Sequence, residues 1–199
     1  MAVKLDTLTH HKYLKYKKKY LSIKKTGIKY DLDNGARVIY FKKYITNTKK
    51  LFEELRTSIP WKQFDYVVHG RTVKSPRLMN IIDLTKNSEL PNFKLVTKKI
   101  EKLTNKQFSY AVLNFYRDGN DYVGYHADRE TNGIVVSVSL GATRRFILRH
   151  KIKENQKHTF LLEDGDVLVL NEAAIKGVYK HSVPKMANVG PRISITFRE

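Results

Sequence analysis

His126 and Asp128 stand two residues apart in the stretch NFYRDGNDYVGYHADRE, which runs from residue 114 to residue 130. Side chains at this spacing lie on one face of an extended segment, where an imidazole and a carboxylate can bind one metal ion. His181 is the best candidate for a third ligand, because it lies between the apolar runs near residues 160–170 and the last predicted strand. Two histidines and one carboxylate, with positions left open, are typical of non-haem Fe(II) oxygenases, although zinc also accepts such a set.

The chain ends on RISITFR, residues 192–198, in which polar and apolar residues alternate strictly. As a strand, it places Arg192, Ser194, Thr196 and Arg198 on one face and three apolar residues on the core face. Two arginines that line an interior require an anion, because unpaired buried guanidinium groups are costly. A dicarboxylate that chelates iron at one end and pairs with an arginine at the other meets this requirement. The alternative is an exposed strand face with solvated arginines.

Composition restricts the class of protein and its partners. The 199 residues are enough for one domain, and 38 Lys and Arg against 19 Asp and Glu leave a net charge of +19. Such an excess favours a polyanionic partner, DNA and/or RNA first and an anionic membrane surface second. The absence of cysteine excludes disulfides, disulfide-linked partners and thiolate chemistry, so His, Asp and Glu must hold any metal.

No apolar run approaches the roughly 20 residues of a membrane span, and no signal peptide is recognisable. We therefore expect an intracellular protein with no membrane partner, in the cytoplasm or nucleus of a host cell or associated with a virion.

The charge is concentrated at the front of the chain, where the first 50 residues hold 14 Lys and Arg against three Asp. Tyrosines at 13, 16 and 20 and an isoleucine at 23 recur at helical intervals, which predicts a short amphipathic helix. We divide the chain into a basic N-terminal extension, residues 1–35, and a domain, residues 36–199.

Within the domain, helices precede strands. The spacing of Phe52, Leu55 and Ile59 predicts one helix, and a second is predicted from Phe93 to Leu103 after Pro91. From Phe108 onward the pattern changes to strands, and Glu163-Asp164-Gly165-Asp166 is predicted to join two of them as a hairpin. The predicted fold class is α+β, with a β-rich C-terminal half that closes into a barrel or a double-sheet jelly roll.

Asn-x-Tyr at residues 114 and 116, His-x-Asp at 126 and 128, the distal His181 and the RISITFR ending occur in an order that resembles the AlkB family of Fe(II)/2-oxoglutarate-dependent dioxygenases. The resemblance spans residues 108–199, is weaker from about residue 37, and is strongest to the nucleic-acid-repair branch. It implies a double-stranded β-helix core and oxidative demethylation of 1-methyladenine or 3-methylcytosine in DNA or RNA. Fe(II), O2 and 2-oxoglutarate would be consumed with release of succinate, CO2 and formaldehyde.

The resemblance also implies roles for individual residues. His126, Asp128 and His181 would bind Fe(II). The co-substrate 2-oxoglutarate would be bound by Asn114, Tyr116, Arg192, Thr196 and Arg198. Six strand residues separate the backbones of the two arginines by roughly 20 Å, so both reach one small ligand only if their side chains converge.

The substrate side is less well defined. Glu130 is the candidate for recognising the exocyclic amine of a flipped base, against a solvated loop acid as the alternative. The chain departs from the family pattern at Ser194, where an asparagine is usual, and after Pro76-Arg77-Leu78, where the usual base-stacking aromatic is missing. Base stacking must then come from elsewhere, and the remaining candidates for substrate binding are Trp61, Phe64, Tyr66, Arg71, Arg77 and Arg198. For each aromatic, core packing is the competing interpretation.

Two rival functions stay open at this point. One is a 2-oxoglutarate-dependent hydroxylase or demethylase that acts on protein. The other is a non-catalytic, basic nucleic-acid-binding protein on the same scaffold.

Overall fold

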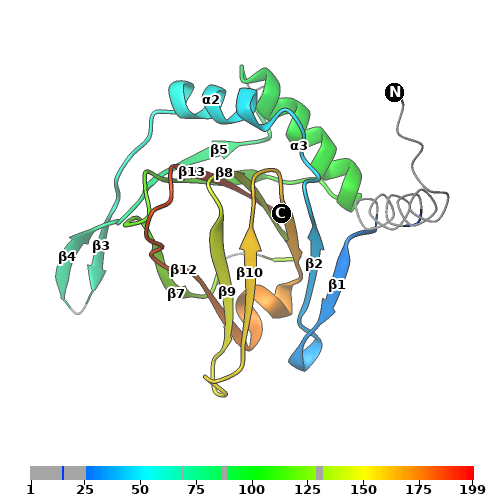
Figure 1. Cartoon of the computed structure of the whole chain (residues 1–199), viewed down its shortest axis with the longest axis vertical. Coiled ribbons are helices and arrows are strands. Elements are labelled where there is room, and N and C mark those ends of the chain that lie inside the picture. Colours follow the sequence, from blue (N-terminus) through cyan, green and yellow to red (C-terminus); the bar gives the residue numbers. More distant parts are fainter. Residues whose placement is uncertain (1–14, 16–25, 69, 87–88, 129–131) are drawn as a thin grey trace, which may run out of the picture.

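In the computed structural model, which describes residues 15, 26–68, 70–86, 89–128 and 132–199, two antiparallel sheets face each other and two helices cover the larger sheet (Figure 1). The larger sheet has seven strands, in the order β1 (Ile28–Asp31), β2 (Arg37–Phe41), β11 (Val167–Leu170), β8 (Val135–Gly141), β13 (Arg192–Arg198), β6 (Tyr110–Tyr116) and β5 (Leu78–Asp83). The smaller sheet has four, in the order β10 (Lys157–Leu162), β9 (Arg144–His150), β12 (Tyr179–Val183) and β7 (Val123–His126). The predicted α+β fold with a jelly-roll core is confirmed.

The remaining elements lie around this core. A separate hairpin of β3 (Asp65–Val68) and β4 (Arg71–Lys74) projects from the side of the barrel (Figure 1). Two short helices, η1 (Asp33–Gly35) and η2 (Ala173–Gly177), connect strands. Within the described ranges, no helix is both long and apolar enough to cross a membrane.

The two helices are α2 (Thr48–Ser58) and α3 (Pro91–Thr104), close to the predicted positions. Each buries one apolar face, which includes Leu51 and Leu55 on α2 and Phe93 on α3. The Glu54 carboxylate joins them, since it accepts hydrogen bonds from the backbone N–H of Asn92 at 3.0 Å and of Phe93 at 2.8 Å. It therefore satisfies the unpaired donors at the start of α3.

Two apolar cores lie on opposite sides of the larger sheet. The outer core packs the helices on the sheet and takes Ile193, Ile195 and Phe197 from β13. The inner core fills the space between the sheets, with Phe146 and Leu148 of β9 among its members. Both faces of β13 are therefore buried, which excludes the interpretation of its arginines as residues of a solvated face.

The predicted hairpin at residues 163–166 is wrong. β10 pairs with β9 in the smaller sheet, whereas β11 pairs with β2 and β8 in the larger one, so the turn carries the chain between sheets. Every residue of β11 is buried, and such a strand gains most by packing between two neighbours. Buried Asp166 fixes the turn because its carboxylate accepts hydrogen bonds from the backbone N–H of Glu163 and Lys43, both at 2.8 Å, and from the Tyr40 hydroxyl.

The N-terminal division is only partly visible. β1 falls in the predicted extension, yet it pairs with β2 as an edge strand of the larger sheet. Apart from Lys15, the predicted helix over Tyr13 to Ile23 lies outside the described residues, and the two-part division of the chain stays a prediction.

Candidate metal centre and co-substrate site

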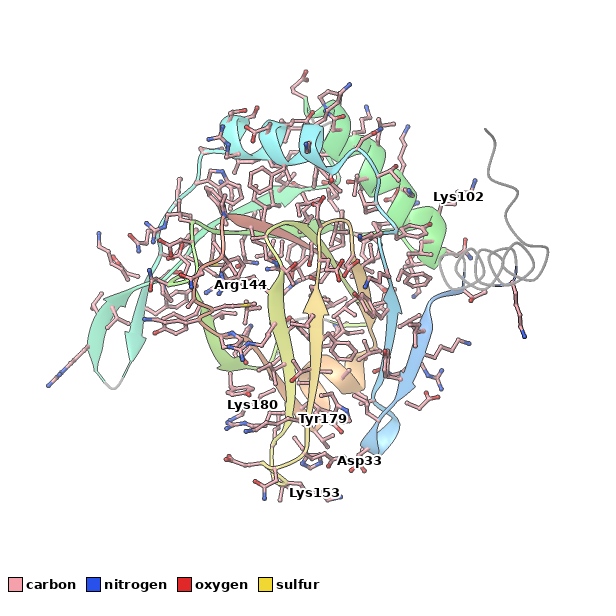
Figure 2. The ribbon with its side chains drawn as sticks, viewed as in Figure 1. Asp33, Lys102, Arg144, Lys153, Tyr179 and Lys180 are labelled. Carbon is pink, nitrogen blue, oxygen red and sulfur yellow. The ribbon has the colours of Figure 1, made fainter. Side chains whose placement is uncertain are left out.

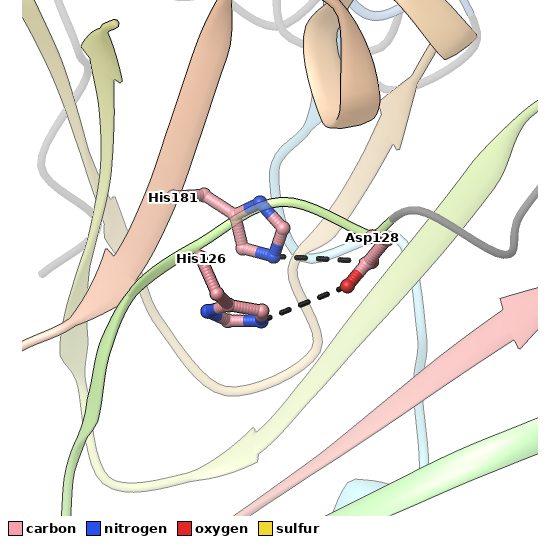
Figure 3. Close-up of side chains that lie close together, drawn as sticks. All are labelled: His126, Asp128 and His181. Atoms are coloured by element: carbon pink, nitrogen blue, oxygen red, sulfur yellow. Dashed lines mark ion pairs between the residues drawn. The ribbon is translucent and has the colours of Figure 1, made fainter. Parts of the chain in front are cut away.

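Pairing of two strands of the smaller sheet brings the predicted metal ligands together. His126 ends β7, His181 lies in β12, and the two are direct partners in the antiparallel register, with ring centroids 4.2 Å apart. Asp128 follows β7, and its backbone N–H donates to the carbonyl of Ile175 at 3.2 Å. The Asp128 carboxylate lies 3.6 Å from His126 Nε2 and 3.9 Å from His181 Nε2 (Figure 3). One ligand atom from each residue fits within 4.8 Å of the other two.

The hydrogen bonding and burial of these residues suit a divalent metal. His126 Nδ1 lies 2.9 Å from the Gly124 carbonyl, and because a carbonyl only accepts, Nδ1 donates to it, which leaves Nε2, the ring nitrogen on the side of Asp128, as the atom to bind a metal. Burial, with a smaller contribution from the neighbouring His126, lowers the pKa of His181 to about 3. His181 is therefore a neutral imidazole at physiological pH, the form that binds metal.

Arg198, at the end of β13, completes this cluster. Its Nη2 donates to the Asp128 carboxylate at 2.9 Å, and its side chain is only 16% exposed. The contact holds the orientation of the carboxylate and leaves its other oxygen directed toward His126.

A cavity of about 400 Å³ opens beside the cluster between the two sheets. Of the residues predicted from the sequence, it is lined by Asn114, Tyr116, His126, Asp128, His181, Thr196, Arg198, Tyr66 and Arg77. Further lining residues that sequence reasoning missed are mainly apolar, among them Met79, Ile81, Val112, Val135, Phe146, Leu170 and Ile175. No local pattern distinguishes these from other core residues, because only the packing of the two sheets opens a space beside them.

Arg192 is fully buried at the other end of β13, 1% exposed, and is not among the residues that line the cavity. Its Nη2 donates to the Ser139 hydroxyl at 2.9 Å, whereas Nε and Nη1 have no hydrogen-bond partner among the described residues. Its guanidinium carbon lies 5.2 Å from the centre of the Tyr116 ring, which lines the cavity. Burial lowers the pKa of Arg192. A buried cation with unused donors fits an anionic ligand, as expected of a 2-oxoglutarate carboxylate.

Arg144 on β9 is a second fully buried arginine, and sequence reasoning missed it. It donates to three backbone carbonyls, those of Asp118 at 3.0 Å, Asp121 at 2.6 Å and Pro184 at 2.8 Å. These carbonyls precede β7 and follow β12, so Arg144 ties together the two strands that carry His126 and His181. The available signal was its place in the alternation of β9, on the same inward face as Phe146 and Leu148.

The predicted substrate-binding residues do not all meet at the cavity. Trp61 packs on Phe115 beside the outer core, with ring centroids 5.2 Å apart, and does not line the cavity. This contact agrees with core packing, the competing interpretation, and the role of Trp61 in base stacking stays a prediction. Phe64 is 39% exposed, and Arg71 is exposed on β4; neither lines the cavity. Glu130 lies outside the described residues.

Arg77 and Tyr66 do reach the cavity. Arg77 is buried and donates through Nε to the Asn114 side-chain oxygen at 2.7 Å, which joins a predicted substrate residue to a predicted co-substrate residue. Tyr66 is 42% exposed, and its hydroxyl lies 3.3 Å from the sulfur of Met79. Met79 is the residue that stands where the family pattern has an aromatic.

The jelly-roll core with a His-x-Asp and distal His cluster beside buried arginines defines a metal-dependent oxygenase type of protein. Comparison with known sequences agrees, since residues 81–198 match the 2OG-Fe(II) oxygenase superfamily. The chain belongs to this superfamily, whose name states the two cofactors that were predicted, Fe(II) and 2-oxoglutarate.

Among curated proteins, the chain is 31% identical over 172 residues to the mouse alpha-ketoglutarate-dependent dioxygenase alkB homolog 3, covering 74% of this chain and 60% of that protein. It is 30% identical over 154 residues to the DNA oxidative demethylase ALKBH2 of cattle, covering 71% of this chain and 54% of that protein. The predicted resemblance to the AlkB family is confirmed, and the chain spans about 60% or less of the length of these relatives.

Among solved structures, the protein titled OsALKBH1 superposes with a TM-score of 0.60 at 18% identity, covering 81% of this chain and 97% of that one. At this identity the likeness supports the fold alone.

Proposed function

We propose that the protein is an Fe(II)/2-oxoglutarate-dependent dioxygenase that removes N-linked methyl groups from 1-methyladenine or 3-methylcytosine in DNA or RNA. The observation that carries the proposal is the convergence of the His126, Asp128 and His181 cluster and Arg198 on one cavity, with buried Arg192 at the other end of the same strand. The relatives named for dioxygenase and DNA demethylase activity support the reaction class. We expect the protein to act inside the cell, where methylated nucleic acid occurs.

His126, Asp128 and His181 would hold the iron. When bound, Fe(II) with 2-oxoglutarate supplies activation of O2, so that one oxygen atom enters succinate and the other reaches the methyl carbon, which leaves as formaldehyde. The chain keeps both imidazole lone pairs available through the Gly124 carbonyl and the burial of His181. Arg198 keeps the Asp128 carboxylate in place.

The co-substrate would lie between the cluster and the Tyr116 ring. Asn114, Tyr116 and Thr196 line the cavity on the face of β6 and β13 that points inward. Arg192, behind Tyr116, supplies the charge for the distal carboxylate, with the two nitrogens that have no hydrogen-bond partner among the described residues available for it. The apolar part of the lining excludes water from the reacting atoms.

The target base would enter beside the β3–β4 hairpin. A base within a duplex cannot present its methyl group, so flipping or a single-stranded substrate is required. Tyr66 and Arg77 both line the cavity; Tyr66 would stack on the base, and Arg77 would contact it or its phosphate. Exposed Arg71 and Phe64 would contact the flanking nucleotides, and Glu130 stays the candidate for recognising the exocyclic amine.

The test is formaldehyde and succinate release from matched oligonucleotides that carry 1-methyladenine or 3-methylcytosine. DNA and RNA, each single- and double-stranded, identify the preferred substrate. We expect turnover that requires Fe(II) and 2-oxoglutarate and stops when a chelator removes the metal. The variant Asp128→Asn should lose more than about 100-fold in activity, since loss of an outer partner of a metal ligand alone typically costs 10–100-fold. Asp31→Asn, at an acid exposed on β1, is the matched control.

Three outcomes separate the candidate functions. Turnover of methylated oligonucleotides by the unaltered protein and the control, but not by Asp128→Asn, supports demethylation. Iron binding without turnover of any methylated oligonucleotide contradicts it. Oxidation of protein substrates with no response to nucleic acid would instead identify a protein hydroxylase.

A further inference from the structure

The outer face of the smaller sheet carries a group of basic side chains outside the cavity. In β9 the inward residues are buried, whereas Arg145, Ile147 and Arg149 point outward. The outward residues of β10 include Lys157, and the exposed residue of β12 is Lys180. None of these side chains lines the cavity.

Three of these cations form a row across three adjacent strands. Arg149 of β9 is the direct register partner of Lys157 on one side and of Lys180 on the other. Neighbouring strands lie about 4.8 Å apart, and like charges directly opposite one another destabilise a sheet. A fold gains nothing from such a row by itself, so the row indicates a ligand that carries repeated negative charge.

The chain provides little compensation for this charge. Arg149 pairs with Glu154 at 3.5 Å, and that glutamate is 64% exposed, so the pair is weak. Neither Lys157 nor Lys180 forms an ion pair with any residue that the structure describes. We call Lys157, Arg149 and Lys180 the basic row.

Aromatic rings lie among the cations and lead toward the metal centre. The Arg149 guanidinium lies 4.0 Å from the centre of the Tyr125 ring, and Lys185 Nζ lies 5.4 Å from that of Tyr122. Tyr125 directly precedes His126, and Lys180 directly precedes His181. Because successive side chains of a strand point to opposite faces, the tyrosine and the lysine point outward and the two histidines point toward the metal centre. The basic row is therefore one sheet thickness from the cavity and ends beside the edge strand β7.

We propose that the basic row binds the sugar-phosphate backbone of the nucleic acid that flanks the reacting base, outside the cavity. The proposal rests on the proposed function for its substrate. Cations at strand spacing suit the closely spaced phosphates, and the tyrosine rings suit an exposed base or sugar. Contacts of this kind carry no sequence information, so the row raises affinity for any long strand and leaves the choice of base to the cavity.

The test compares two double variants with equal loss of charge. Lys157→Gln with Lys180→Gln removes two cations of the row. Lys98→Gln with Lys102→Gln removes two exposed cations of α3, on a different side of the molecule from Lys180, as Figure 2 shows for Lys102. Affinity for an unmethylated 20-nucleotide strand is measured by fluorescence anisotropy at several salt concentrations, and methylated 20-nucleotide and trinucleotide substrates are compared in turnover.

We expect the row variant to bind the 20-nucleotide strand roughly tenfold more weakly at about 0.1 M salt. The slope of log affinity against log salt should fall in magnitude by about 1.4, because each of the two lost phosphate contacts on a single strand contributes about 0.7. KM for the long substrate should rise, while kcat, and both constants for the trinucleotide, stay unchanged. The thermal midpoint should not fall, because a repulsion is removed. The α3 variant should match the unaltered protein.

The binding measurement does not depend on demethylation. Loss of affinity in the row variant alone supports the proposal even if no methylated base is turned over. Equal affinities of the two variants, together with normal demethylation, would overturn the basic row and leave the proposed function intact. Unchanged binding to the strand with lost binding to phosphatidylserine vesicles would overturn it in favour of a membrane surface.

Discussion

The two ends of β13 carry the same residue in opposite circumstances. Arg198 lies at the cavity and is paired with a carboxylate of the chain, Asp128, at 2.9 Å. Arg192, six residues earlier on the same face, is buried with a hydroxyl as its acceptor and has two nitrogens without a hydrogen-bond partner among the described residues. At one end of the strand a carboxylate of the chain balances the arginine charge. At the other end the arginine charge is left for a ligand to balance. This difference agrees with the proposed orientation of 2-oxoglutarate.

The largest expected effect is that of Arg192→Met. Loss of the charge that pairs with the distal carboxylate should raise KM for 2-oxoglutarate by about 100-fold or more, since hydrogen bonds to charged groups contribute about 1.5–3 kcal/mol each. Without 2-oxoglutarate the variant should be as stable as the unaltered protein or more stable, because an uncompensated buried charge is gone. Thermal unfolding and steady-state kinetics measure the two effects. A loss of stability at unchanged KM would mean that Arg192 serves the fold and does not bind the co-substrate.

Arg198→Met should act on the metal instead. Without its contact, the Asp128 carboxylate is free to rotate, and the apparent affinity for Fe(II) should fall about 10- to 100-fold. Titration of the apoprotein with Fe(II), followed by turnover, measures this. A change confined to KM for 2-oxoglutarate would show instead that both arginines serve the co-substrate.

Binding of 2-oxoglutarate should stabilise the protein through the Arg192 end. At about 100 times its Kd, the co-substrate should contribute about 2.7 kcal/mol and raise the thermal midpoint by roughly 5–10 °C. Pyruvate, which lacks the distal carboxylate, should produce little shift at the same concentration. Equal shifts with both compounds would contradict a role for Arg192 in recognition of the distal group.

The smallest effect is expected for Ser139→Ala. The Ser139 hydroxyl accepts a hydrogen bond from Arg192 at 2.9 Å, and its loss should cost about 1 kcal/mol in the free energy of unfolding. KM for 2-oxoglutarate should change by less than about fivefold, since the arginine charge remains. A larger rise in KM, measured with unchanged stability, would show that the hydroxyl itself helps to bind the co-substrate.

Several features could be predicted because they depend on local spacing. Helical periodicity located α2 and α3, and the strict alternation of residues 192–198 assigned Ile193, Ile195 and Phe197 to the core. The spacing of His126 and Asp128 likewise selected the pair that the structure brings near His181. In each case neighbours along the chain decide which face a side chain occupies, and this information is contained in a few residues.

Other features depend on which elements meet. Alternation showed that the runs on both sides of residues 163–166 are strands, but it could not show that they join different sheets. Trp61 has the same neighbours in the sequence whether it stacks on a base or on Phe115, and its contact with Phe115 is visible only in the tertiary packing. The role of Arg144 depends on three carbonyls from two distant segments.

The sequence by itself determined the chemistry available to this protein: a His-x-Asp pair, a distal histidine, two arginines on one strand face and no cysteine. Only the tertiary structure decided that the two arginines have different partners: Arg198 pairs with the carboxylate of Asp128, whereas Arg192 is buried without a carboxylate partner among the described residues. The reason is physical, because residue type and spacing define a side chain's face and charge. Burial and the identity of its partner depend on segments up to 70 residues away, as between Asp128 and Arg198.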